Sequence, residues 1–354
     1  MDNKNSKKKM IISAAAFIAV VVGVFAYIFK GYDFNTLTAA VMSANPVYLA
    51  LGALGMCCFI CCESLNIGRV LRALGNSNGF LQDLKYGALG FFFSGITPSA
   101  SGGQPMQLYS MSRDNIEISH GSLALLTEVT GFQFVNVLLA TIGLTGNYSY
   151  IMSLGVTIKI LVFAGLSISS GILVFLFIAL FCPELADHLG NKIKAFLIRI
   201  NKDKAAEGVA GQIEEYRRGS EYIKAHKSLL LKTVATTLVQ MLALYSITYF
   251  VYCALGGTAV SWFTMMTLQA VLTAGVSVVP LPGGTGAGEG GFRLMFAQLF
   301  LGGTLMPGML ISRGLSFYLG MILAGIVILI AMIGKSRRGL FFSCRIKHLL
   351  TASL

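Results

Sequence analysis

The sequence breaks twice within apolar stretches, at Gly95-Ile96-Thr97-Pro98-Ser99-Ala100-Ser101-Gly102-Gly103-Gln104-Pro105 and at Val279-Pro280-Leu281-Pro282-Gly283-Gly284-Thr285-Gly286-Ala287-Gly288-Glu289-Gly290-Gly291. Proline and glycine interrupt a helix and leave backbone N–H and C=O groups without helical partners. Inside a bilayer, such groups are tolerated only where protein or a water-filled cavity satisfies them. A matched pair of interrupted segments in two halves is typical of the binding site of a transporter. The pair therefore predicts a membrane protein that binds a molecule at bilayer depth.

The composition supports membrane insertion. The chain has 354 residues, of which 55% are hydrophobic and only 12% are charged, whereas about a quarter of a soluble domain is charged. The uncharged runs 10–29 and 160–181 are each long enough to cross a hydrocarbon core of about 30 Å. The first run follows a lysine cluster, and no small-residue cleavage site comes after it, so it is expected to be an uncleaved anchor.

The net charge of +12 lies in the loops between apolar runs, which is the positive-inside pattern and not a nucleic-acid footprint. Six segments are predicted to span the membrane: 10–29, 47–65, 123–144, 160–181, 229–252 and 309–333. If 84–112 also crossed, the very basic segment 182–227 would lie outside. If 84–112 and 262–303 are instead re-entrant hairpins, every basic cluster and both termini lie in the cytoplasm.

This topology makes the second half repeat the first with opposite orientation. We expect an all-α integral membrane protein with six spans and two re-entrant broken hairpins in an inverted-topology repeat, with halves 1–150 and 151–354. Segment 184–227 mixes basic, acidic and apolar residues, and is expected to form amphipathic helices on the cytoplasmic surface. The basic tail from Gly339 to Leu354 either lies on anionic headgroups or is disordered.

The two glycine loops are the candidate substrate site. Free helix ends present N–H groups that suit a phosphate or carboxylate, and glycine allows close backbone approach. The alternative is that these glycines only let helices pack closely. The loop residues expected to line the site are Gly102, Gly103, Gln104, Gly283, Gly284 and Thr285.

Four charged residues complete the predicted site. Glu289 lies within the second loop and takes a proton, pairs with a cationic headgroup, or pairs with Arg293 at i,i+4. Arg293 and Arg313 are candidate phosphate ligands, because guanidinium forks onto phosphate oxygens. Glu128 is either a functional carboxylate within a span or a group that reaches cytoplasmic water. Glu63 is expected to end the second span and to reach water or pair with Arg69.

Other motifs in the sequence give weaker evidence of a function. The pattern Gly286-x-Gly288-x-x-Gly291 matches a dinucleotide fingerprint, but no strand precedes it, so no nucleotide cofactor is expected. Cysteines 57, 58, 61 and 62 lie in one apolar run without a nearby histidine, so packing or lipidation is favoured over metal binding. The four histidines are scattered. We predict neither a metal, a cofactor nor a catalytic residue.

The segments Pro98-Ser99-Ala100-Ser101-Gly102-Gly103-Gln104-Pro105 and 280–290 resemble the two signature segments of the lysylphosphatidylglycerol synthase membrane-domain family, also called the flippase-like domain family. The resemblance covers nearly the whole chain. It implies a protein that moves phospholipids between leaflets and that is linked to resistance against cationic antimicrobial peptides. Larger members carry a soluble domain that transfers lysine from lysyl-tRNA to phosphatidylglycerol, and only about twenty residues follow Ile333 here.

The resulting hypothesis is a bacterial cytoplasmic-membrane protein that translocates an anionic or lysyl-modified phosphatidylglycerol and is not an enzyme by itself. Two alternatives remain: a phosphatidylglycerol lysyltransferase component that acts with a separate catalytic domain, and a proton-coupled small-solute transporter. The expected partners are a phospholipid and the membrane, without nucleic acid. A separate cytoplasmic transferase and a second copy of the chain are left open as further partners.

Overall fold

The computed structural model describes residues 34–97, 100–182, 199, 203–277, 279, 286–301 and 303–333, and within these ranges the chain is helical without strands. Five helices are long and apolar enough to cross a membrane: α3 (Pro46–Ala73), α6 (Ile118–Gly146), α8 (Val156–Phe181), α11 (Lys227–Ala254) and the helix Leu305–Ile333. Five of the six predicted spans are therefore confirmed as long apolar helices. The sixth, 10–29, lies outside the described residues, as does the tail from Gly339.

The helix Leu305–Ile333 is not uniform. It begins as α14 (Leu305–Arg313), passes through the π-helical segment η3 (Gly314–Tyr318), and continues as an α-helix to Ile333. A π-helical insertion widens one turn and often marks a functional position. Here it directly follows Arg313, one of the predicted site residues.

Helix α3 is longer than hydropathy predicts. Asn45 caps its first turn, because the Asn45 side chain accepts a hydrogen bond from the Val47 N–H at 3.0 Å, and Pro46 occupies the first helical position. The predicted span ends at residue 65, but the helix continues to Ala73. Its polar continuation is satisfied by α11: Asn66 Nδ2 donates to Thr237 Oγ1 at 2.9 Å, and Arg69 donates to Thr236 Oγ1 at 2.8 Å.

Both interrupted segments are broken helices, as predicted. The first consists of α4 (Phe80–Ile96, 17 residues) and α5 (Gly103–Ser112, 10 residues), and the second of α12 (Trp262–Val276, 15 residues) and α13 (Ala287–Phe296, 10 residues). Each of these helices is shorter than the roughly 20 residues that a crossing requires. We call these pairs the first hairpin and the second hairpin.

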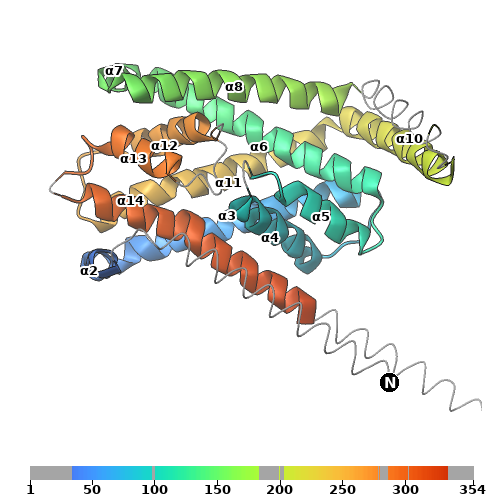
Figure 1. Cartoon of the computed structure of the whole chain (residues 1–354), viewed down its shortest axis with the longest axis horizontal. Helices are drawn as coiled ribbons and strands as arrows, with labels where there is room; N and C mark the ends of the chain where they lie inside the picture. Colours follow the sequence, from blue (N-terminus) through green and yellow to red (C-terminus); the bar gives the residue numbers. More distant parts are fainter. Residues whose placement is uncertain are drawn as a thin grey trace, which may run out of the picture.

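The two hairpins begin at opposite ends of the molecule (Figure 1). The base of the first hairpin lies at the end that carries α10 (Asp203–Ala225), whereas the base of the second lies at the opposite end, near α7 (Tyr148–Ser153) and α2 (Phe34–Ser43). Both tips point toward the middle. Each half contains the same succession of a long helix, a broken hairpin and a second long helix, and in the second half α8 and α10 come before it.

Helices α3 and α11, which hold equivalent places in this order, form the most extensive helix–helix contact among the described elements. Helix α6 is the most buried of the five long helices and α8 is the least. Helix α8 therefore presents a broad apolar face to its surroundings, as expected for a helix that contacts lipid. The exposed large side chains of α8 are Val156, Ile160, Phe163, Ile168, Ile172, Val174, Phe175, Phe177 and Ile178.

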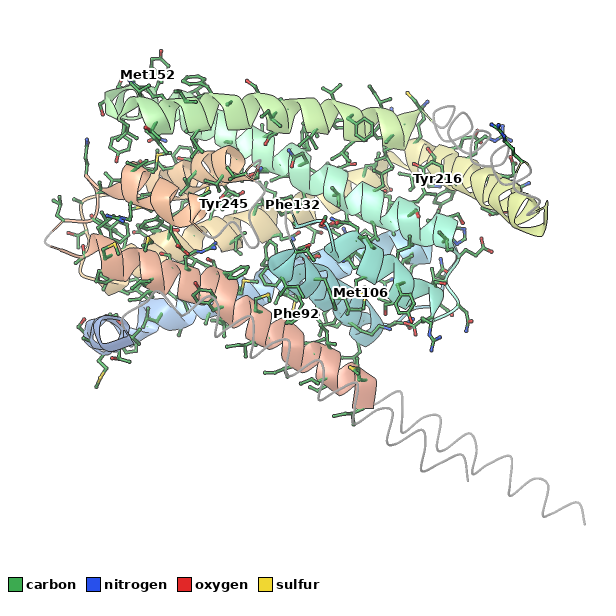
Figure 2. The ribbon with its side chains drawn as sticks, in the orientation of Figure 1. Phe92, Met106, Phe132, Met152, Tyr216 and Tyr245 are labelled. Carbon is green, nitrogen blue, oxygen red and sulfur yellow. The ribbon has the colours of Figure 1, made fainter. Side chains whose placement is uncertain are left out.

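Helix α10 covers part of the predicted amphipathic segment 184–227 and lies on the surface. Tyr216 Oη donates to Ala179 O at 2.9 Å and Ser220 Oγ donates to Leu180 O at 2.6 Å, which ties α10 to the end of α8. Tyr216 is visible at this junction in Figure 2. Residues 183–198 and 200–202 lie outside the described ranges.

Candidate functional site

A cavity of about 340 Å³ lies between the tips of the two hairpins. Both hairpins contribute to its wall, together with α11, α14 and η3. Its lining residues are Phe91, Ser94, Ala100, Leu244, Tyr245, Thr248, Gln269, Leu272, Thr273, Val276, Ser277, Val279, Gly288, Phe292, Ser312, Arg313, Ser316 and Phe317. Figure 2 shows Tyr245 near the middle of the bundle, beside the second hairpin. The two sequence breaks therefore meet at one chamber, although they are far apart along the chain.

Arg313 and Glu289 form an ion pair at this chamber. Arg313 Nε lies 3.8 Å from Glu289 Oε1, and the two side chains are 20% and 18% exposed. The guanidinium also stacks 4.9 Å from the centre of the Phe317 ring, and Gly288 leaves it space, because a Cβ on Gly288 would lie 3.8 Å from Arg313 Nη1. Arg313 lines the cavity, and Glu289 pairs with it without being one of the lining residues.

The pair is loosely made. A separation of 3.8 Å is longer than a charge-assisted hydrogen bond, for which about 2.8 Å is usual. Glu289 Oε1 is buried and makes no hydrogen bond among the described residues. A buried carboxylate oxygen in this state costs free energy, which a ligand or water can recover. Glu289 therefore has one carboxylate oxygen whose hydrogen-bonding capacity is unused among the described residues.

Hydroxyl and amide groups supply the remaining polarity of the cavity wall. Thr248 Oγ1 donates to Gln269 Oε1 at 3.0 Å, and Thr273 Oγ1 donates to the Gln269 backbone oxygen at 2.9 Å. Ser312 Oγ is buried and has no hydrogen-bond partner in the described part of the chain. The cavity wall is thus mostly apolar, with polar groups from serine, threonine, glutamine and Arg313 side chains set into it.

The other predicted loop residues have different surroundings. The Gly102 N–H donates to Thr97 Oγ1 at 2.9 Å, so the turn itself satisfies this donor. Gly103 is buried, and a Cβ there would lie 2.8 Å from Gly90 O, so this glycine permits the close contact of α5 with α4. Gln104 is exposed. Gly283, Gly284 and Thr285 lie outside the described residues.

Arg293 and Glu128 do not line the cavity. Arg293 is in the last turn of α13 and its side chain is exposed. Glu289 pairs with Arg313, which is distant in sequence and could not have been chosen from helical spacing alone. Glu128 is buried within α6 and is 7% exposed, so the alternative in which it reaches cytoplasmic water does not describe its position.

The expectation for Glu63 is wrong. Glu63 does not end a span or pair with Arg69. It lies within α3, ten residues before Ala73, and is 9% exposed. Its carboxylate is close enough to Glu128 for the two charges to repel, and Gln107 of the first hairpin forms a hydrogen bond with it. Arg69 instead donates to Asn66 and Thr236. The prediction failed because the polar residues after Glu63 continue the helix.

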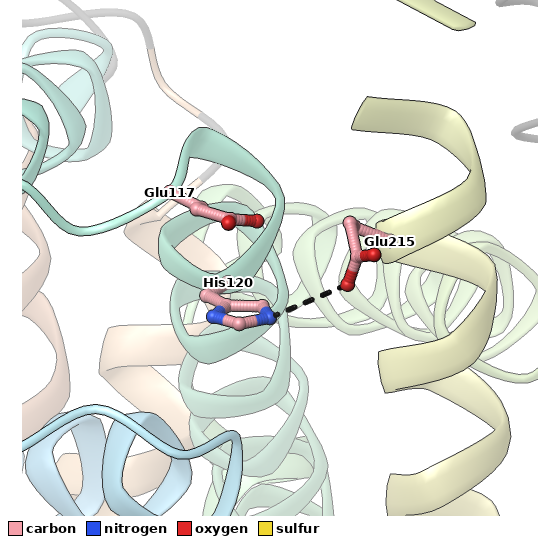
Figure 3. Close-up of side chains that lie close together, drawn as sticks. All are labelled: Glu117, His120 and Glu215. Atoms are coloured by element: carbon pink, nitrogen blue, oxygen red, sulfur yellow. Dashed lines mark ion pairs between the residues drawn. The ribbon is translucent and has the colours of Figure 1, made fainter. Parts of the chain in front are cut away.

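A second polar cluster lies at the junction of α6 and α10 (Figure 3). His120 Nε2 lies 4.0 Å from Glu215 Oε2, and Glu117 completes the group. Asn76 Nδ2 donates to Leu71 O at 3.1 Å and lies 3.2 Å from His120 Nδ1. Because this amide is a donor, Nδ1 acts as the acceptor and Nε2 carries a proton toward Glu215. The cluster therefore joins α10 to α6 by a histidine–carboxylate contact and does not present a free imidazole nitrogen to a metal.

Comparison with known proteins identifies the family. Residues 12–324 match the family described as the lysylphosphatidylglycerol synthase transmembrane region. A UPF0104 membrane protein of Archaeoglobus fulgidus is 26% identical over 291 residues, which cover 79% of this chain and 85% of that protein. A UPF0104 membrane protein of Pyrococcus horikoshii is 20% identical over 306 residues, which cover 81% and 88%. The chain is a multi-pass membrane protein that belongs to the lysylphosphatidylglycerol synthase transmembrane-region family.

Proposed function

We propose that this protein binds the headgroup of an anionic phospholipid, phosphatidylglycerol or its lysyl derivative, in the cavity between the hairpins and moves it between leaflets. The observation that carries the proposal is the cavity between the hairpins, whose wall includes Arg313 and several hydroxyl and amide groups, with Glu289 paired to Arg313. In a lipid environment, charged and polar groups in the wall of a cavity suit a ligand that is itself partly polar. A volume of about 340 Å³ is at the lower end of the range for small-molecule sites.

The proposed topology places the two hairpins as re-entrant segments that enter from opposite faces of the membrane. The hairpin bases at opposite ends of the molecule support this arrangement (Figure 1), and so does the repeated order of elements. The base of the first hairpin and the end of α3 carry four basic residues: Arg69 and Arg72 near the end of α3, Lys85 near the beginning of α4, and Arg113 at the end of α5. By the positive-inside rule, the end of the molecule that holds the base of the first hairpin faces the cytoplasm.

Each group in the chamber has a role in the proposed binding mode. The Arg313 guanidinium contacts phosphate oxygens, because its planar donors match two of them at once. Glu289 contacts the ammonium groups of a lysyl ester, and this contact replaces its ion pair with Arg313. Hydroxyl groups such as those of Thr248 and Thr273 bond to the glycerol. The acyl chains remain in the bilayer while the headgroup passes between the tips.

The test is a translocation assay in reconstituted vesicles that contain fluorescent phosphatidylglycerol in both leaflets. A membrane-impermeant reductant quenches the outer leaflet, and the further loss of fluorescence reports movement of the inner lipid. Arg313→Ala is expected to lower the rate at least about tenfold, equivalent to the loss of one charged hydrogen bond of roughly 1.4 kcal/mol or more. Arg293→Ala is the matched control, because Arg293 is an exposed arginine of the second hairpin that does not line the cavity.

The result can contradict the proposal in two ways. If Arg313→Ala and wild type move the lipid equally fast at equal protein density, Arg313 does not bind the headgroup. The wild-type protein is also compared with protein-free vesicles for phosphatidylglycerol, its lysyl derivative and a zwitterionic phospholipid. If none of these lipids moves between leaflets faster with the protein than without it, the protein is not a translocator of these lipids. A rate loss in Arg293→Ala as large as in Arg313→Ala would place the headgroup outside the cavity.

A further inference from the structure

We propose that Glu63 and Glu128 form a buried site for one monovalent cation, either a proton or an alkali-metal ion, beneath the first hairpin. The two carboxylates come from α3 and α6 and are 9% and 7% exposed. They lie within electrostatic reach of each other. This site is separate from the cavity that Arg313 lines, since neither carboxylate is among the lining residues.

The carboxylates lie at the same depth. Glu63 is ten residues from the end of α3 at Ala73, and Glu128 is ten residues from the beginning of α6 at Ile118. At 1.5 Å per residue, this is about 15 Å from the end of the bundle that carries α10. Two ionised carboxylates at this depth repel each other and lose their hydration. Because of this cost, a bound cation is the simplest way for both groups to remain there.

The protein itself does not supply that cation. Among the described residues, no lysine, arginine or histidine forms an ion pair with Glu63 or Glu128. On α11, Lys232 is exposed. The other charged groups on the elements around the site have partners elsewhere: Arg72 with Asp83, Lys85 with Asp114, Arg69 with Asn66 and Thr236, and His120 with Glu215.

A second observation points to a missing ligand at this site. Gln240 of α11 is 0% exposed, and neither its Nε2 nor its Oε1 has a hydrogen-bond partner in the described part of the chain. Leaving both atoms of one buried amide without partners costs free energy that a bound ligand can recover. The Oε1 atom of Gln240 is a suitable ligand for a proton-bearing carboxyl group or an alkali-metal ion.

The register of α3 and α11 places Gln240 level with Glu63. The helices are antiparallel, since Asn66 contacts Thr237 while a Cβ on Gly55 would lie 2.9 Å from Ala243 O. Glu63 is three residues before Asn66 on α3, and Gln240 is three residues after Thr237 on α11. Both spacings keep the same helix face. The fully buried Gln240 therefore lies at the same depth in the bundle as Glu63, on the helix that packs most extensively against α3.

The first hairpin covers this site. Gln107 Nε2 donates to Tyr86 O at 3.1 Å, and the Gln107 amide also bonds to Glu63. Gly90 of α4 leaves the space, because a Cβ there would lie 3.0 Å from Glu63 Oε1. Four residues after Gly90, Ser94 lines the cavity. Occupancy of the cation site is thus expected to set the position of the hairpin that forms one wall of the cavity.

The test measures the melting temperature of the full-length protein in detergent, which does not depend on lipid translocation. The pH is varied from about 5 to about 9, across the range in which a buried carboxyl pair titrates. Sodium or potassium chloride is titrated at each pH, with choline chloride keeping the ionic strength constant. A ligand that binds only the folded state raises its melting temperature in proportion to the logarithm of its concentration, once it is well above its dissociation constant.

Two results support the site. If the bound cation is a proton, the melting temperature of the wild type falls by at least about 2 °C as the pH rises, and alkali-metal ions have no effect. If it is a metal ion, sodium or potassium restores the melting temperature at high pH. In either case Glu63→Gln and Glu128→Gln are expected to lose the response. Glu221→Gln is the matched control, since Glu221 is an exposed glutamate of α10, and it is expected to respond as the wild type does.

Gln240→Leu is a second variant that keeps both carboxylates and the side-chain size. It is expected to shift the cation concentration at the midpoint of the melting-temperature response at least about tenfold, because one ligand of the cation is lost. The proposal is overturned if the wild type, both glutamine variants and Gln240→Leu show the same melting temperatures throughout the pH and salt series. That outcome leaves the proposed lipid translocation unaffected, and a loss of translocation in Arg313→Ala leaves this cation site unaffected.

Discussion

Tyr245 donates a hydrogen bond to Asn136 Oδ1 over 2.6 Å, and both side chains are 1% exposed. This bond joins α11 to α6 at the wall of the cavity, because Tyr245 is also a lining residue. A polar contact so deeply buried between two long helices positions the chamber relative to the rest of the bundle. The position of the cavity wall therefore depends on Asn136, which does not line the cavity itself.

Tyr245→Phe is expected to lower the stability of the protein by about 1–3 kcal/mol, because Asn136 Oδ1 loses its donor in a place that excludes water. The measurement is the melting temperature in detergent. Tyr109→Phe is the matched control, since Tyr109 is 58% exposed on α5. Equal melting temperatures for Tyr245→Phe and the control would show that the bond contributes nothing.

Glu289→Gln is expected to change lipid preference. The substitution removes the negative charge opposite Arg313, so the local field favours an anionic ligand more strongly than in the wild type. Translocation of phosphatidylglycerol is expected to rise or stay constant, while that of lysylphosphatidylglycerol falls at least about tenfold. The ratio of the two rates in the same vesicles is the measurement, with Glu221→Gln as the exposed control. An unchanged ratio would remove Glu289 from headgroup recognition.

Gly165→Ala is expected to displace the second hairpin. A Cβ on Gly165 of α8 would lie 2.7 Å from Ala274 O and 2.6 Å from Gly275 O of α12, and these are backbone atoms that cannot rotate away. Overpacking of this kind costs about 1–3 kcal/mol. The matched control is Gly171→Ala on the same helix, where nothing lies within 4 Å of the added Cβ. Melting temperature and translocation rate should fall in the first variant only.

Tyr150→Phe tests how the second hairpin is anchored at its base. Tyr150 Oη donates to Met295 O at 2.6 Å, and burial raises the pKa of Tyr150 to about 12. The neutral phenol is the donor, so its stabilisation is complete below the unfolded-state pKa near 10 and is lost as the pH rises toward 12. Tyr150→Phe is therefore expected to be about 1 kcal/mol less stable than wild type at pH 8. That difference should shrink by pH 11, and a constant difference would contradict the assignment.

The sequence alone was sufficient for the parts of the fold that depend on local composition. Long uncharged runs must be helical in lipid because each backbone group needs an internal partner, so five predicted spans appear as helices. The clustering of proline and glycine prevents a continuous helix, so both hairpins break where predicted. The predicted end of α3 was too early. The polar residues after Glu63 form hydrogen bonds with α11, and hydropathy does not indicate such bonds.

Charge patterning and residue types singled out Glu289 and Arg313 as candidate site residues, since charged groups at bilayer depth are costly. Only the tertiary structure decided which of the charges meet. Glu289 pairs with Arg313 and not with Arg293, and Glu128 lies beside Glu63 and not at the cavity. The physical reason is that helix identity follows from short-range composition, whereas the partners of a buried charge depend on the packing of helices that are distant in sequence.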